Sequence, residues 1–323
     1  MTTANTTKTR PSAAANKPFT RFGPTAEDKP DAFAKVTEKI IAYLEKGVRP
    51  WHQPWKAKQA AGSITRPLRS VGSPYHGINT VVLWITAIEK GYSSPFWMTY
   101  NQARDYEAHV RKGEKGTTVF YASRFTKVEA DANGEEKEVE IPFLKQYTVF
   151  NVEQVEGLPP HFAKLEERTA TVEERIGHAE DFAAKTKADI RHGGGKTFYM
   201  PGEDRIQMPP YETFEGREAY YSTLFHELTH WTAKKSRLDR SLDSKRFGDT
   251  GYAREELVAE LGAAFLCCDL GITPEVREDH AGYLSSWLKV LKEDSKAIFQ
   301  AAAAAEKAAT YLQQMQIGLQ PAE

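Results

Sequence analysis

Apolar residues recur at helical spacing in several stretches of the chain. Gly47 and Gly91 follow the first two stretches, and Thr99 with Gln102 forms a capping box before the third. The predicted helices cover residues 31–46, 78–90, 99–110, 171–187, 222–234 and 251–266, with further helices up to the alanine-rich stretch before residue 311. The C-terminal half is therefore predicted to be mainly helical.

Other stretches follow the two-residue period of strands. Residues 118–121 and 143–150 are rich in aromatic and β-branched residues, and they bracket an acidic stretch with Asn133-Gly134 at its middle. These features predict a long hairpin with a solvated tip. Two short strands are predicted near residues 196–200 and 205–208.

Composition shifts divide the chain into regions. Residues 1–29 are polar and interrupted by prolines, which is typical of a disordered leader. Pro159-Pro160 and the charged run that follows mark a linker at residues 159–172. We expect an α+β protein of two domains: residues 30–158 with an antiparallel sheet and flanking helices, and residues 173–323 with helices and a small sheet.

Bulk composition limits the classes of protein that fit. The chain has 323 residues, of which 40% are hydrophobic and 27% charged, so there is room for two cores. A net charge of −1 gives no global attraction to nucleic acid, and any attraction must come from local patches. Cys267 and Cys268 are adjacent and badly placed to pair, which favours a reducing cytoplasm. No apolar run reaches transmembrane length and no signal-peptide core is present, so no membrane partner is expected.

The most specific chemical signal is an H-E-x-x-H run formed by His226, Glu227 and His230. On a helix the two imidazoles stand one turn apart and can bind the same Zn²⁺, while Glu227 is placed to act as general base on a water that the metal activates. The alternative is a surface helix that carries these residues by chance. The flanking apolar residues Leu224, Phe225, Leu228 and Trp231 favour a buried site.

A catalytic zinc usually takes a third protein ligand, and the helix at 251–266 offers one. The four-residue spacing of Glu256 and Glu260 resembles the glutamate helix of gluzincin peptidases. By that resemblance Glu256 is the ligand and Glu260 orients a ligating histidine. An exchange of these two roles, or a solvated acidic stripe that includes Glu255, are the alternatives. Tyr252 could polarise a carbonyl oxygen, or it could serve packing.

The N-terminal domain interleaves aromatic residues with cations, as proteins do that stack bases and neutralise phosphates of single-stranded DNA. The segment at 110–118 is the best phosphate contact, because it combines two glycines with three cations. Core packing is the competing explanation for the aromatic residues. The candidate DNA-binding residues are Trp51, Trp55, Trp97, Tyr100, Arg104, Arg111, Lys112 and Lys115.

Several motifs in order resemble one family. Trp51-x-x-Pro-Trp55, Tyr75-His-Gly-Ile-Asn79 and the runs at 97–103 and 110–117 look like signatures of the ArdC-type N-terminal domain, and the runs at 225–232 and 252–263 look like its metallopeptidase domain. The resemblance implies a plasmid-type antirestriction protein, related to a domain of conjugative TraC primases, that binds single-stranded DNA and shields incoming DNA from restriction.

Two hypotheses follow from this resemblance. In the first, the DNA-binding domain brings a zinc peptidase to host restriction subunits or DNA-bound proteins, which it cleaves. In the second, occupancy of the DNA or binding of restriction subunits gives protection without cleavage, and zinc holds the C-terminal domain together. The C-terminal half also resembles Spartan-type proteases, whose third ligand is a histidine shortly after the motif. No histidine follows His230 before His280, so a glutamate remains the expected ligand.

Overall fold

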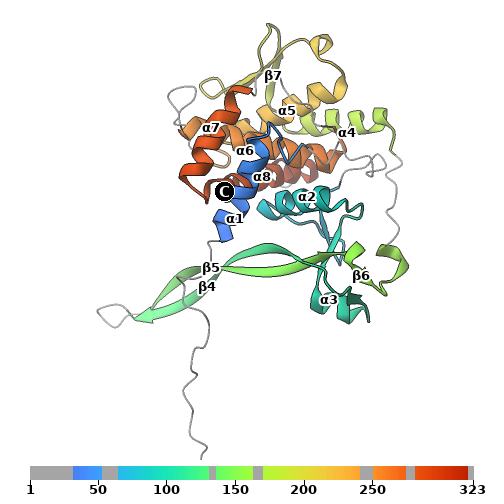
Figure 1. Cartoon of the computed structure of the whole chain (residues 1–323). Helices are drawn as coiled ribbons and strands as arrows, with labels where there is room; N and C mark the ends of the chain where they lie inside the picture. Colours follow the sequence, from blue (N-terminus) through green and yellow to red (C-terminus); the bar gives the residue numbers. More distant parts are fainter. Residues whose placement is uncertain are drawn as a thin grey trace, which may run out of the picture.

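The computed structural model describes residues 32–52, 65–130, 136–162, 170–240, 250–273 and 281–318. The predicted leader, the hairpin tip at Asn133-Gly134 and Trp55 lie outside these residues. The N-terminal elements, drawn from blue to green in Figure 1, are α1 (Ala32–Leu44), β1 (Leu68–Arg69), α2 (Ile78–Lys90), β2 (Phe96–Thr99), α3 (Tyr100–Asp105), β3 (His109–Val110), β4 (Thr117–Ala130), β5 (Glu136–Asn151) and β6 (Val155–Glu156).

The N-terminal sheet has the strand order β1-β2-β5-β4. Its long hairpin pairs β4 with β5 in antiparallel register from Thr117 opposite Val149 to Ala130 opposite Glu136. β2 also pairs antiparallel with β5, whereas the short β1 runs parallel to β2. The predicted antiparallel sheet and hairpin are confirmed, and two strands that were not predicted, β2 and the parallel edge strand β1, complete the sheet.

The C-terminal elements are α4 (Val172–Lys185), β7 (Asp189–His192), β8 (Phe198–Met200), β9 (Arg205–Met208), α5 (Arg217–Trp231), α6 (Thr250–Leu270), α7 (Ala281–Glu293) and α8 (Ala297–Gln314). Helices dominate this region, as expected, and the three short strands form a sheet in the order β7-β9-β8. The sequence predicted β8 and β9 but not β7. In β7 the side chains are exposed or half-buried, so no alternation of apolar and polar residues marks it.

Helix α3 is shorter than the predicted helix at 99–110. The capping box at Thr99 and Gln102 is present. The helix ends at Asp105 because Glu107 takes a left-handed conformation, with φ at 58°, and the next residues form β3, which pairs with β6. Backbone pairing with a distant strand therefore overrides the helical pattern.

The first part of the predicted linker is packed into the N-terminal region. Pro160–Phe162 forms a turn of 3-10 helix, and the Phe162 ring lies 5.4 Å from that of Phe96 and 5.2 Å from that of Tyr106. Residues 163–169 lie outside the described part of the chain, and Thr171 caps α4.

The largest hydrophobic core includes residues of both halves of the chain. The length of the sequence had allowed for two separate cores. The rings of Trp84 and Phe265 lie 6.1 Å apart, and those of Trp51 and Trp287 lie 6.0 Å apart. In Figure 1, α1 and α2 accordingly lie against the C-terminal helices rather than in a separate lobe. Within the described residues, no helix has the length and apolar character needed to span a membrane.

A buried ionic cluster also joins the halves. The guanidinium of Arg66 donates to both oxygens of Asp269, at 2.7 and 2.8 Å, and to both oxygens of Glu306, at 2.8 and 2.7 Å. The backbone N–H of Gly77 donates to Glu306 at 2.9 Å, and His76 Nδ1 lies 2.8 Å from the same carboxylate. Part of the Tyr75-His-Gly-Ile-Asn79 signature therefore serves the junction with α6 and α8.

Candidate functional site

Helices α5 and α6 carry the residues that the sequence predicts at the metal. Helix α5 is buried on nearly all sides, which matches its lack of a polar face. The two helices approach closely at Gly262, where an added Cβ would lie 2.6 Å from Cγ2 of Thr229. Glycine is required at this contact because any side chain would push α6 away from α5. Thr229 lies between His226 and His230 on α5. Gly262 lies less than two turns beyond Glu256 on α6.

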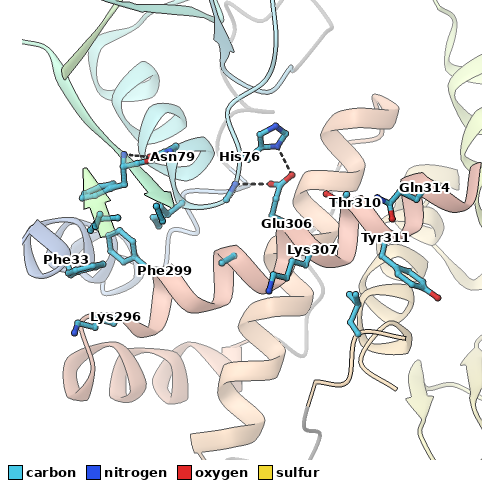
Figure 2. Close-up of a pocket in the computed structure, with 17 residues that line it drawn as sticks. Phe33, His76, Asn79, Lys296, Phe299, Glu306, Lys307, Thr310, Tyr311 and Gln314 are labelled. Carbon is cyan, nitrogen blue, oxygen red and sulfur yellow. Dashed lines mark hydrogen bonds and ion pairs between the residues drawn. The ribbon is translucent and has the colours of Figure 1, made fainter. Parts of the chain in front are cut away.

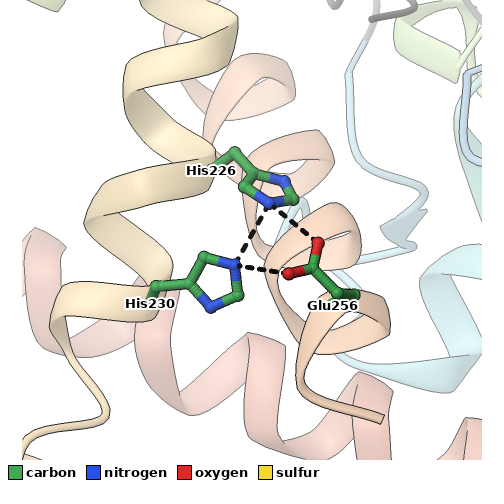
Figure 3. A group of neighbouring side chains, drawn as sticks. All are labelled: His226, His230 and Glu256. Atoms are coloured by element: carbon green, nitrogen blue, oxygen red, sulfur yellow. Dashed lines mark hydrogen bonds and ion pairs between the residues drawn. The ribbon is translucent and has the colours of Figure 1, made fainter. Parts of the chain in front are cut away.

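Three predicted ligands converge at this helix pair (Figure 3). The Nε2 atoms of His226 and His230 are 3.2 Å apart. In Glu256, Oε2 lies 3.4 Å from Nε2 of His226, and Oε1 lies 3.5 Å from Nε2 of His230. All of these donor atoms lie within 4.8 Å of one another, so a single ion placed among them could be bound by all three. Glu227 is buried on the same helix, next to His226.

The outer contacts of His230 fit a metal ligand. Its Nδ1 lies 3.2 Å from Oε1 of Glu255, and Arg240 donates to both oxygens of Glu255, at 3.2 and 2.9 Å. If Nδ1–H donates to this carboxylate, the lone pair on Nε2 faces the ligand cluster, which is the tautomer that a metal requires. The donor set of two imidazoles and one carboxylate is one that zinc takes in catalytic sites.

Electrostatics keep Glu256 in its charged form. Burial disfavours ionisation, but hydrogen bonds from His226 and His230 outweigh it and lower the pKa of Glu256 well below its usual value. Burial likewise opposes protonation of His230, and its contacts with Glu255 and Glu256 overcome this and raise its pKa to about 10. Without a cation, His230 is therefore protonated at neutral pH, and a cation that binds Nε2 must displace that proton. The cluster therefore presents an ionised carboxylate to a cation at neutral pH.

Glu260 contacts the segment that follows α1, and its expected role in orienting a ligating histidine stays a prediction. Its Oε2 lies 3.3 Å from Nε1 of Trp51, 3.2 Å from Nε2 of His52 and 3.7 Å from Nη1 of Arg49, so Glu260 holds the segment that follows α1. Glu255, which the sequence assigned to a solvated stripe, contacts the candidate ligand His230. This contact depends on packing that spacing alone does not specify.

Tyr252 lies one turn before Glu256 on α6. Its hydroxyl is 2.9 Å from that of Tyr283, and the two rings stack at 5.9 Å. Burial, then the charge of Glu256 and hydrogen bonds to Tyr283 and Glu256, raise the pKa of Tyr252 far above its usual value. Tyr252 is therefore a neutral hydroxyl beside the ligand cluster, and it also contributes to packing.

Two predicted DNA-binding aromatic residues are buried. Trp51 is 0% exposed and Trp97 is 1% exposed, and each packs edge-to-face against another aromatic ring. Their assignment as base-stacking residues is wrong in this structure, because neither ring offers a face to solvent. The competing explanation, core packing, holds for both.

The remaining predicted DNA-binding residues are exposed around α3 and β3. Tyr100 begins α3 and is 55% exposed, and Arg104 is exposed on the same helix. Arg111, Lys112 and Lys115 are exposed in the loop between β3 and β4. Two features of this loop serve the fold itself.

The first of these features is an ion pair, since Arg111 binds Glu114 at 2.7 Å and its charge is partly neutralised. The second is Gly116, where an added Cβ would lie 2.3 Å from Cγ2 of Thr148 on β5. That glycine is explained by packing, whereas Gly113 has φ at 90° and makes the turn.

An exposed tyrosine pair on the hairpin was not among the predicted site residues. Tyr121 on β4 and Tyr147 on β5 are 50% and 44% exposed, and their rings lie 6.4 Å apart at 70°. Lys145 is exposed opposite Tyr121. Strand alternation could have identified this pair, because it places Tyr121 and Tyr147 on one face together with Val119.

Comparison with known proteins shows the class of protein to which the chain belongs. Residues 30–150 match the family described as the N-terminal domain of anti-restriction factor ArdC, and residues 177–304 match a zincin-like metallopeptidase family. The fold thus joins an ArdC-type N-terminal domain to a zincin-like domain. A crystal structure of metal-free antirestriction ArdC protein from plasmid R388 is 45% identical, with a TM-score of 0.74, and the match covers 90% of this chain and all of that one. The chain belongs to the ArdC family of antirestriction proteins.

Other relatives agree with this assignment. The Mn(II)-bound structure of the R388 protein is 43% identical, with a TM-score of 0.73, over 90% of this chain and all of that one. The uncharacterized protein y4eC of Sinorhizobium fredii is 40% identical over 90% of this chain and 94% of that protein. Two DNA primases TraC of Escherichia coli are 41% and 39% identical over 87% and 86% of this chain, which spans only 27% and 19% of their length. The resemblance to TraC is confirmed, and no priming activity is inferred for this chain.

Proposed function

We propose that this ArdC-family protein binds single-stranded DNA and protects incoming conjugative DNA from host restriction in the cytoplasm. The observation that carries the proposal is the set of exposed aromatic and cationic side chains on one region of the N-terminal sheet. Tyr121 and Tyr147 offer rings for base stacking, and Tyr100 offers another at α3. Exposed Lys112 and Lys115 offer charge for phosphates.

Fluorescence anisotropy with a labelled single-stranded oligonucleotide tests this binding. Base stacking contributes about 1–3 kcal/mol per base, so Tyr121→Ala combined with Tyr147→Ala should weaken affinity by at least about tenfold. Lys112→Gln should reduce the dependence of log affinity on log salt by about 0.7, the value for one phosphate contact on a single strand. Val71→Ala, at a residue that is 76% exposed, is the control. Unchanged affinity in the tyrosine variant would contradict the assignment of this surface.

We further propose that His226, His230 and Glu256 hold a divalent cation, with zinc as the expected ion and Mn²⁺ able to replace it. The geometry and charge of the cluster support this, as does the Mn(II)-bound structure of the R388 relative. A bound cation would supply Lewis acidity to a carbonyl and a water molecule. In this proposal Glu227, which follows His226 on α5, would accept a proton from that water, and the neutral Tyr252 hydroxyl would donate to a developing oxyanion.

Peptide hydrolysis is therefore the reaction that the site supports, with restriction subunits or DNA-bound proteins as candidate substrates. Incubation of metal-loaded protein with such substrates, with and without single-stranded DNA, should show cleavage that Glu227→Ala abolishes. Equal loss of substrate with the wild type and the variant would rule out catalysis by this residue.

A second candidate function is protection by occupancy alone, with a structural cation. The buried position of the ligands between α5 and α6, at a required helix contact, favours a contribution of the ion to stability. In that case Glu227→Ala protects DNA as well as the wild type does, whereas His226→Ala yields less folded protein. Loss of protection by a folded Glu227→Ala variant that still binds DNA would exclude this candidate.

A further inference from the structure

A cleft of about 920 Å³ lies between α8, the hairpin and the start of α2 (Figure 2). Its size falls in the range of ligand sites in proteins. The lining comes from both halves of the chain: α8 contributes Phe299, Lys307 and Tyr311, the hairpin contributes Phe120 and Leu144, and α1 contributes Phe33. The cleft therefore exists only where the ArdC-type and zincin-like regions meet, and it is separate from the ligand cluster on α5 and α6.

Three phenylalanine rings gather at one end of this cleft. The Phe299 ring lies 4.6 Å from that of Phe33 and 5.1 Å from that of Phe120, in edge-to-face contacts at 73° and 88°. Phe33 and Phe299 are only partly buried. Ala303, exposed on the next turn of α8, leaves room beside them. A flat π system could enter and contact these rings without moving the backbone.

The charge along the cleft is positive. Lys296 and Lys307 are both exposed, and among the described residues neither ammonium has a carboxylate partner at ion-pair distance. The one acidic lining residue, Glu306, is already engaged by Arg66, His76 and the N–H of Gly77. An anionic ligand would thus meet Lys307 and Lys296, whose ammonium lies 5.6 Å from the centre of the Phe33 ring, and a carboxylate that already has three partners.

The two lysines are too far apart to hold one phosphate. Lys296 is the N-cap of α8, and Lys307 lies eleven positions further along, which corresponds to about 16 Å along the helix axis. A ligand that uses both must be extended, with negative charge at more than one point and flat apolar groups between. A single-stranded nucleic acid has this chemistry.

We propose that the cleft is a second contact for single-stranded DNA, in which unpaired bases lie against the phenylalanine rings and the strand's phosphates contact Lys296 and Lys307. This inference rests on the proposed DNA binding. Leu144 and Ala122, in the cleft, lie on the face of the hairpin opposite to Tyr121 and Tyr147. A strand that passes around β4 and β5 can therefore reach both contacts, and DNA bound in this way touches α8 of the zincin-like region directly.

The test uses the full chain and a fluorescent single-stranded oligonucleotide. Ala303→Trp fills the cleft from an exposed position and should weaken affinity about tenfold, the lower part of the range for loss of a stacked base. Lys296→Gln combined with Lys307→Gln should reduce the salt dependence of log affinity by about 1.4, which is twice the value for one contact. Lys289→Gln, at an exposed lysine on α7 outside the cleft, is the matched control.

Photo-crosslinking with an oligonucleotide that contains 5-bromodeoxyuridine provides a second readout. Adducts on peptides that contain Phe33, Phe299 or Tyr311 support the proposal. Wild-type affinity and salt dependence in the cleft variants, with adducts confined to Tyr121 and Tyr147, would overturn it while leaving the proposed function intact. Binding of a fatty-acid probe that Ala303→Trp abolishes, without any effect of that variant on DNA affinity, would assign the cleft to another ligand. Absence of any DNA binding by the wild type would instead contradict the proposed function.

Discussion

The ring of His230 is contacted at both nitrogens, and each contact has a different consequence. Nε2 faces His226 and Glu256, whereas Nδ1 meets Glu255, which Arg240 holds in turn. A carboxylate behind a ligating histidine fixes the ring orientation and makes the ligand more basic. The affinity of the site for metal should therefore depend on Glu255.

Glu255→Gln is expected to weaken metal affinity by about 10–100-fold, because an amide holds the imidazole less strongly than a carboxylate does. Glu38→Gln, at an exposed glutamate on α1, is the matched control. That variant should retain both metal affinity and stability. Competition with a chromogenic chelator measures the affinity, and urea unfolding measures the stability. Equal metal affinity in the Glu255→Gln variant and the wild type would contradict this role of Glu255.

The sequence predicted the ligand residues better than their neighbours. The i, i+4 spacing of His226 and His230 is sufficient to bring their rings together on one helix, and the structure places Glu256 beside them. The contact of Glu255 with His230 depends instead on the rotation of α6 about its own axis and on Arg240, which lies in the segment between α5 and α6. Short-range patterns do not encode that rotation.

At the scale of elements, the approach of α5 and α6 controls the site. Gly262→Ala introduces a Cβ at 2.6 Å from Thr229, which is fully buried, so one helix must move. Overpacking of this kind costs about 1–3 kcal/mol of unfolding free energy, and the shift should also weaken metal affinity. Gly177→Ala on α4 is the opposite case, because nothing lies within 4 Å of its added Cβ.

The Gly177→Ala change should raise the free energy of unfolding by about 0.4–1 kcal/mol, since alanine loses less backbone entropy on folding. Urea unfolding of both variants, each with a metal titration, gives the comparison. If Gly262→Ala also raises the free energy of unfolding, the helix contact at Gly262 is looser than these distances indicate.

Elements with a clear local pattern were predicted well. Helix α2 begins and ends at the predicted residues, because its apolar spacing is regular and Gly91 supplies the left-handed C-cap. The hairpin also follows its alternation. The short strands β1, β2, β3, β6 and β7 were not predicted, and α5 begins at Arg217, before the predicted start at Ser222. Two of these errors are at α3, where the turn at Glu107 gives way to pairing between β3 and β6, and at β7, which has no apolar alternation. Both depend on strand partners that are remote in the sequence.

At the scale of the whole molecule, the boundary between the two matched families is not a boundary between cores. The largest core combines residues of α1 and α2 with residues of α5 to α8. Arg66, 5% exposed, binds Asp269 and Glu306 across the junction. A buried guanidinium placed between two carboxylates is costly to separate from either. The sequence suggested two units because composition shifts near residue 159, but side chains on both sides share one interior.

This shared interior predicts that the two regions unfold together. Leu83→Ala removes a fully buried side chain from a small cluster that consists of N-terminal residues, with Tyr75, Trp97, Val119 and Val149. The loss should be about 3 kcal/mol. If the chain is one cooperative unit, the amides of α5 should lose hydrogen-exchange protection by the same factor as those of α2, about a hundredfold. Val71→Ala, at an exposed residue, should change neither. Full protection of α5 in the Leu83→Ala variant, with that of α2 reduced, would show that the zincin-like region folds independently of the N-terminal sheet.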